Sequence, residues 1–117
     1  MRLMMWGAAA VLLAGGVVRA HAAQEPDAKA LYSDTCKKCH GVLGVPPQKM
    51  KKKYEKIATF DEKFLATRSE DSIVKVLTKG KGEDMESFKD KLSPADLRAL
   101  AKYVRELAAK PKAGGSS

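Results

Sequence analysis

The amino-acid sequence predicts a small all-α domain of about four helices. Two stretches, residues 69–79 and 93–110, place apolar side chains three or four positions apart between capping residues. No runs rich in Val, Ile, Phe and Tyr indicate the strands of an α/β fold. The 117 residues are enough for one such domain.

Residues 1–23 have the pattern of a cleavable secretory signal. Arg2 precedes an uncharged run over residues 3–18, and small residues around 20–23 suit cleavage. The run is shorter than the ~20 residues of a membrane-spanning helix, which disfavours a retained anchor. Cleavage leaves 94 residues and lowers the formal net charge from +8 to +6, because the segment holds two arginines and no acid. We therefore expect an exported, periplasmic protein.

The first helix is expected to begin at Pro26 and Asp27 and to reach the first cysteine. Leu31 and Tyr32 lie on the stripe that repeats every three or four residues, so both are predicted to face the core.

Residues 36–41 read Cys-Lys-Lys-Cys-His-Gly, which contains the C-x-x-C-H pattern of a covalent c-type haem attachment site. Two thiols three positions apart in a helical turn point the same way, so Cys36 and Cys39 can bond to the two vinyl groups of one haem c. His40 follows on the same turn and can give the iron a neutral imidazole nitrogen as proximal ligand. The four helices would then pack around one covalently attached haem.

Two other uses of the motif fit the sequence less well. The two cysteines could instead form a short disulfide or a dithiol redox pair, but a thioredoxin-like dithiol would need βαβ units, which the sequence does not predict. A structural zinc site takes four ligands, and the sequence has no second Cys or His pair to complete it.

After Gly41, residues 42–47 are predicted to form a loop because they contain one glycine and two prolines. Pro46 or Pro47 could place a backbone carbonyl against the second ring nitrogen of His40, although an ordinary turn role is equally compatible. Beyond the loop lies a lysine cluster, which is either a solvated face or a docking patch for an acidic partner. Its members are Lys49, Lys51, Lys52, Lys53 and Lys56.

A second helix is expected from Ser69, as N-cap, to Lys79, with Gly80 as its stop. The following glycine-bearing loop contains Met85, whose thioether is a soft donor suited to the sixth position of a haem iron. His21 leaves with the signal or stays in a frayed terminus, so a second imidazole ligand is not expected. Met50 is the rival thioether, but three lysines follow it.

The last helix has Ser93 as cap, Pro94 at the first position and Asp96 in a capping box. Its expected core stripe is Leu97, Leu100, Ala101, Val104, Leu107 and Ala108. The domain is expected to span residues 24–110, with a disordered tail over 111–117.

With both ends of the haem site in place, the chain resembles class I cytochrome c over most of the predicted mature domain. The resemblance implies that the first and last helices cross, through Ala28 and Tyr32 on one and Leu100 and Tyr103 on the other. Ala28 replaces a usual glycine, and Glu86 stands where many members have proline.

The resemblance implies a periplasmic carrier of single electrons and not an enzyme. Its partners would be redox proteins with acidic docking patches, and neither nucleic acid nor, once the signal is cleaved, a membrane is expected. A haem subunit of a periplasmic oxidoreductase complex is the alternative, and a ligand-binding haem sensor is a third reading. A domain this small needs the haem to fill its centre, so the apo chain should fold poorly.

Overall fold

The computed structural model describes residues 15–16 and 25–112, so the predicted signal at 1–23 and tail at 111–117 lie almost entirely outside the described residues. Among the described residues, the structure is helical and has no strand; only an isolated bridge pairs Lys81 with Met85. The predicted all-α class is confirmed.

The longest helix, α6 (Pro94–Ala109), forms as its sequence predicts. The Ser93 side chain accepts a hydrogen bond from the Asp96 backbone N–H, and the Asp96 side chain accepts one from the Ser93 N–H. This capping box satisfies two backbone donors at the helix start. All six predicted stripe residues are buried.

Two further helices follow their predicted caps. At the start of α1 (Ala28–Thr35), the Asp27 side chain accepts a hydrogen bond from the Ala30 N–H at 3.1 Å. At the start of α5 (Glu70–Lys79), the Ser69 hydroxyl oxygen accepts one from the Ser72 N–H, also at 3.1 Å. The positive φ of Gly80, 73°, ends α5, as expected for a glycine that leaves a helix.

The described part of the chain contains six helices where about four were expected, because three of them are single turns or little more. These are α2 (Lys37–His40), α3 (Gln48–Lys53) and α4 (Glu62–Thr67). The Asp61 carboxylate caps α4 through the Phe64 N–H at 2.9 Å. No side chain caps α3, and it has no apolar stripe, so neither a cap nor periodicity predicted it.

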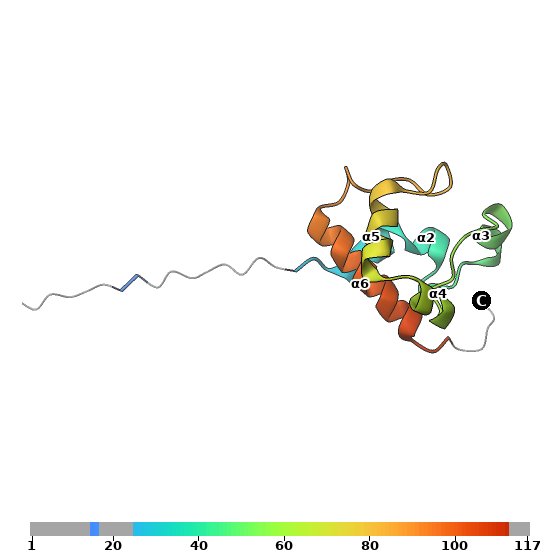
Figure 1. Ribbon diagram of the computed structural model, residues 1–117, viewed down its shortest axis with the longest axis horizontal. Helices are drawn as coiled ribbons and strands as arrows, with labels where there is room; N and C mark the ends of the chain where they lie inside the picture. The colour runs from blue at the N-terminus through green and yellow to red at the C-terminus, as the bar shows by residue number, and fades with distance from the viewer. Residues whose placement is uncertain (1–14, 17–24, 113–117) are drawn as a thin grey trace, which may run out of the picture.

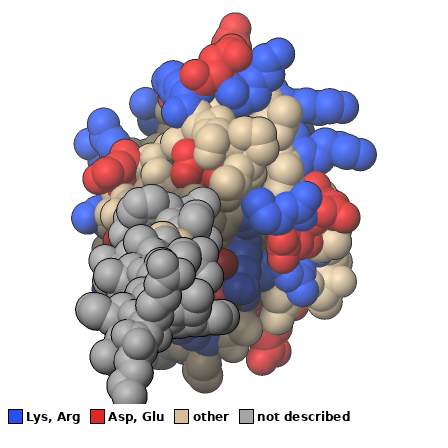
Figure 2. Space-filling model, turned by 90° about the vertical axis from the view of Figure 1, so that its left-hand side faces the viewer, with Lys and Arg blue, Asp and Glu red and all other residues tan. Residues whose placement is uncertain are grey.

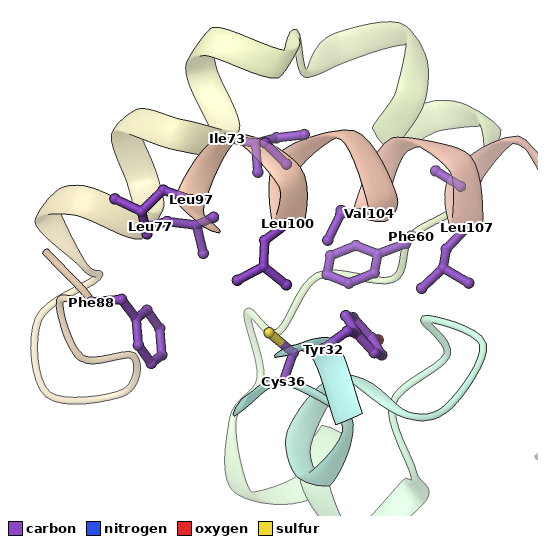
Figure 3. Packing of buried hydrophobic residues seen from close by; sticks show 12 residues of the cluster. Tyr32, Cys36, Phe60, Ile73, Leu77, Phe88, Leu97, Leu100, Val104 and Leu107 are labelled. Carbon is purple, nitrogen blue, oxygen red and sulfur yellow. The ribbon is translucent and has the colours of Figure 1, made fainter. Parts of the chain in front are cut away.

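Helix α6 is the centre of the packing, with α1, α4 and α5 against it, while α3 stands apart at one side (Figure 1). Figure 3 shows Tyr32 and Cys36 facing the α6 side chains, with Phe60 and Phe88 brought in from loops. The buried cluster consists of Tyr32, Cys36, Phe60, Ile73, Leu77, Phe88, Leu97, Leu100, Ala101, Val104, Leu107 and Ala108. The core therefore connects α6 with Cys36 of the attachment motif and with Phe88, which follows the loop that carries Met85.

The predicted crossing of the first and last helices is present. The rings of Tyr32 on α1 and Tyr103 on α6 lie 5.3 Å apart at 54°, and Leu100 is fully buried beside them. Within the described residues, no helix is both long enough and apolar enough to cross a membrane.

Candidate haem site

The predicted attachment motif forms one tight turn. The backbone N–H groups of Cys39 and His40 both donate to the Cys36 carbonyl, at 3.2 and 2.9 Å, which holds the three residues on α2. Cys36 is buried, Cys39 is half-buried, and both thiols are free. Burial, with a smaller contribution from Cys39, raises the pKa of the Cys36 thiol to about 11. Dithiol redox centres need a low thiol pKa, so this environment disfavours the thioredoxin-like alternative.

His40 is fixed by two contacts from a distant segment. Its ring stacks on Phe60, with centroids 4.8 Å apart and an angle of 18°, and Nδ1 lies 3.3 Å from the Ala58 carbonyl oxygen. A carbonyl only accepts, so Nδ1 carries the proton and Nε2 keeps a free lone pair. Burial lowers the pKa of His40, although the Ala58 hydrogen bond opposes this effect. The ring is thus prepared as a neutral nitrogen donor.

The expectation that Pro46 or Pro47 supplies this carbonyl is wrong. Gly41 and Gly44 both have φ of 80°, which turns the loop back on itself, and the Gly44 carbonyl then accepts the Phe60 N–H at 2.8 Å. That bond brings the segment 58–60 under the imidazole. Sequence reasoning missed Ala58 and Phe60 because this contact joins residues about eighteen positions apart.

Tyr32 ties α1 to the residue after the histidine. Its hydroxyl donates to the Gly41 carbonyl at 2.6 Å, and its ring lies edge-on to Phe60 at 6.4 Å. The side chain is only 1% exposed. Its role therefore goes beyond the plain packing predicted from the sequence. Burial, followed by the charges of Cys36 and Tyr103, raises its pKa well above the usual 10.0.

We expect Tyr32→Phe to destabilise the protein by about 1 kcal/mol at neutral pH, because one buried neutral hydrogen bond is lost. The folded state keeps Tyr32 protonated at pH values at which the unfolded chain already ionises it. The stability that this gives is fully present below pH 10 and is lost as pH rises above 10, at up to about 1.4 kcal/mol per pH unit. Urea unfolding at several pH values measures both effects. The variant should lose less stability than wild type between pH 10 and 11.5, and parallel losses would contradict the assignment.

The loop from Gly80 to Phe88 carries Met85. The Lys81 N–H donates to the Met85 carbonyl at 2.7 Å, which closes the loop on itself. The Gly80 N–H donates to the Val76 carbonyl at 2.6 Å and the Phe88 N–H to the Leu77 carbonyl at 2.9 Å, so both ends of the loop are anchored to α5. Met85 is half-buried and packs against the buried cluster that contains Cys36. The positive charge of Lys81, in the same loop, also acts to lower the pKa of His40.

The rival Met50 has a different setting. It is half-buried in α3, the helix that stands apart from the packed core, and exposed lysines flank it. The residues that follow Met50 are exposed lysines, whereas Phe88, three residues after Met85, is buried. Both methionines are half-buried, and of the two it is Met85 that packs against the buried cluster.

The donor set fits a haem better than a bare metal ion. Within the described ranges, no three His, Cys, Asp or Glu side chains group as they would around an ion. The chain instead presents two free thiols and one neutral imidazole on a single turn, and a thioether on a loop packed against the same core. Haem c is attached by two thioether bonds, and histidine with methionine is a ligand pair that its iron takes in cytochromes c.

These features define a class I c-type cytochrome: a small helical domain whose C-x-x-C-H turn lies against crossed first and last helices. The family model for "Cytochrome C oxidase, cbb3-type, subunit III" matches residues 23–104. The chain belongs to this family.

Solved structures agree with this assignment. The structure titled KustC0563 c-type cytochrome is 33% identical, with a TM-score of 0.65, and the match covers 71% of this chain and 99% of that one. A point mutant of the same protein, with phenylalanine in place of a tyrosine, gives 32% identity and a TM-score of 0.63, with coverage of 70% and 99%. No curated protein matches. The chain is a haem-bearing electron-transfer protein, and its family implies a covalently bound haem c.

Proposed function

We propose that this chain carries single electrons between redox proteins in the periplasm, with one haem bonded through Cys36 and Cys39 and its iron ligated by His40 and Met85. The observation that carries the proposal is that Cys36, at the start of the attachment turn, belongs to the buried cluster against which Met85 packs. A haem c bound there supplies reversible one-electron exchange between ferrous and ferric iron.

The residues of the chain have separate tasks in this scheme. The Ala58 carbonyl holds the Nδ1 proton of His40, which would leave the Nε2 lone pair free to bind the iron of a haem held by this turn. Met85 would supply the second protein ligand to that iron, which would leave no open position for a substrate and would make the protein a carrier and not an enzyme. The weak thioether donor favours the ferrous state relative to a second imidazole.

Carbon monoxide tests the proposal against the sensor alternative. The purified, reduced protein should give one reversible one-electron wave by voltammetry and an unchanged visible spectrum under carbon monoxide at neutral pH. Rapid formation of a carbon monoxide complex would mean that the sixth position is open or labile, and would reject the carrier assignment.

The lysine cluster is the proposed docking surface for an acidic partner. All five of its lysines are exposed, and α3 contains no acid. The face in Figure 2 differs, because Lys and Arg alternate there with Asp and Glu. Clustered like charge raises association rates without requiring tight binding.

Replacing Lys51, Lys52 and Lys53 with Gln should slow electron transfer to an acidic redox protein. The Debye length falls from ~30 Å at 0.01 M to ~8 Å at 0.15 M ionic strength, so the wild-type rate should drop steeply over that range. Stopped-flow mixing measures it. Lys75, Lys79 and Lys89, changed together to Gln, give a control with the same charge loss. If both triple variants slowed electron transfer equally, the lysine cluster would be an ordinary solvated face and not a docking surface.

A second candidate is a haem subunit of a periplasmic oxidoreductase complex. The observation that favours it is the family model, whose description names an oxidase subunit. Purification under mild conditions distinguishes the two: a carrier elutes as a monomer, whereas a subunit copurifies with stoichiometric partners that exchange electrons with it.

A further inference from the structure

Arg105, on α6, is half-buried and reaches across to the end of another helix. One nitrogen of its guanidinium group donates to the Leu65 carbonyl at 3.1 Å and to the Arg68 carbonyl. Within the described residues, the ion pairs belong to Lys91 and Arg98, so this guanidinium binds backbone carbonyls and no carboxylate. Hydrogen bonds with a charged donor are roughly twice as strong as neutral ones. Arg105 therefore links α6 firmly to α4.

Helix α4 is short and only partly covered. None of its six residues is fully buried, and it lies beside α6 (Figure 1). Phe64 and Leu65 pack against the buried cluster, but both keep part of their surface exposed. The last carbonyl groups of a helix have no partner within it, and Arg105 provides one for the end of α4. The guanidinium group therefore adds a polar anchor where apolar packing is incomplete.

Aromatic rings continue this link from α4 to the histidine. The ring of Phe64 on α4 lies 4.9 Å from that of Phe60, and Phe60 stacks on His40 at 4.8 Å. Asp61, which caps α4, directly follows Phe60 in the chain. The same segment supplies the Ala58 carbonyl oxygen, 3.3 Å from Nδ1 of the imidazole. A shift of α4 would therefore move both the ring and the carbonyl that fix His40.

The residues that contact the imidazole are held from two sides. The Gly44 carbonyl accepts the Phe60 N–H at 2.8 Å on one side, and Arg105 holds the helix that follows on the other. We propose that Arg105 is a positioning residue for the haem site. By fixing α4 on α6, it keeps Phe60 and the Ala58 carbonyl against the His40 ring. The Ala58 contact orients the imidazole and raises its donor strength. This inference rests on the proposed function, in which His40 binds the haem iron.

Exchange of the His40 Nδ1 proton with solvent tests this role, because NMR of the reduced, haem-loaded protein follows that proton directly. Arg105→Met keeps an apolar side chain and removes its donors. The proton should then exchange about tenfold faster than in wild type, since a hydrogen bond from a charged group contributes at least that factor. Arg98→Met is the matched control. It removes the same charge from the same helix, where Arg98 pairs with Glu70 and Asp71 at the surface, and its His40 proton should exchange at the wild-type rate.

The amide proton of Leu100 separates positioning from overall stability. Leu100 is fully buried within α6, so its N–H exchanges when the whole fold opens. In Arg105→Met, the His40 proton should accelerate more than this amide proton. Equal acceleration of the two, or no acceleration of the His40 proton, would overturn the positioning role. Arg105→Lys keeps a charged donor on a shorter side chain and should lie between wild type and Arg105→Met. If Arg105→Met does not fold, the same comparison of the two protons in Arg105→Lys decides.

The wild-type haem site separates this inference from the proposed function. In the oxidised protein, iron-bound His40 should show ring protons that paramagnetic ferric iron shifts far from their ordinary positions. Their absence would reject the ligation that the proposed function assigns to His40, and the inference with it. Shifted ring protons in wild type, combined with unchanged proton exchange in Arg105→Met, would overturn only the role of Arg105.

Discussion

Met85→Ala is expected to lower the reduction potential of the protein and to abolish the weak far-red sulfur-to-iron band of its oxidised form. Axial ligands move haem potentials within a span of about 0.8 V, so loss of the thioether should shift the potential by on the order of 0.1 V or more. Protein-film voltammetry and visible spectroscopy measure the two effects. Reduced Met85→Ala should also bind carbon monoxide readily.

Met50→Ala is the matched control, because it removes the same side chain from α3. Both the potential and the band should stay close to wild type. The reverse pattern, with the band lost in Met50→Ala and kept in Met85→Ala, would assign the sixth ligand to Met50.

The position of the Met85 loop should depend on Gly80. Gly80 has φ of 73°, and a Cβ built there would lie 2.7 Å from the Met85 carbonyl oxygen and 2.7 Å from the Ser87 nitrogen. Gly80→Ala must therefore displace the loop or strain the backbone. We expect a weakened far-red band with Met85 still present. Gly82, whose added Cβ would meet nothing within 4 Å, gives a control for the strain of a positive φ alone.

Cys36→Ala combined with Cys39→Ala is expected to prevent stable folding. A domain of this size has a total stability of about 5–15 kcal/mol, and a group that binds only the folded state contributes its binding free energy to that stability. Circular dichroism should show most of the helical signal lost at 25 °C. Lys37→Ala with Lys38→Ala alters the same turn without removing a thiol, and it should fold like wild type. A fully helical, cooperatively unfolding cysteine-free variant would contradict the predicted role of haem in the core.

The sequence was sufficient for those elements whose signals are local. Ser93, Asp96 and the stripe from Leu97 to Ala108 form a capped amphipathic helix, and the structure reproduces it in detail. The helix between Ser69 and Gly80 was predicted from the same kinds of signal: a serine N-cap, apolar residues at helical spacing and a glycine at its end. The C-x-x-C-H turn was equally local, since its spacing alone placed both thiols and the imidazole on one helical turn.

The remaining features depend on contacts between distant segments. The carbonyl that fixes His40 belongs to Ala58, because Gly44 pairs with Phe60 and draws that segment under the ring. The spacing of apolar residues along the sequence gives no information on a hydrogen bond between two distant loops. The short helices α3 and α4 also escaped prediction, since a single turn has too few residues for a recognisable apolar stripe.

The central claim, a haem covalently attached through Cys36 and Cys39 after export, is tested most directly by intact-mass spectrometry of the protein from the periplasmic fraction. The account predicts a chain that begins near residue 24, carries the added mass of one haem, and keeps that mass after acid extraction. Fragmentation should place the haem on the peptide that contains Cys36, Cys39 and His40. An unmodified mass with a disulfide between Cys36 and Cys39 would contradict the claim.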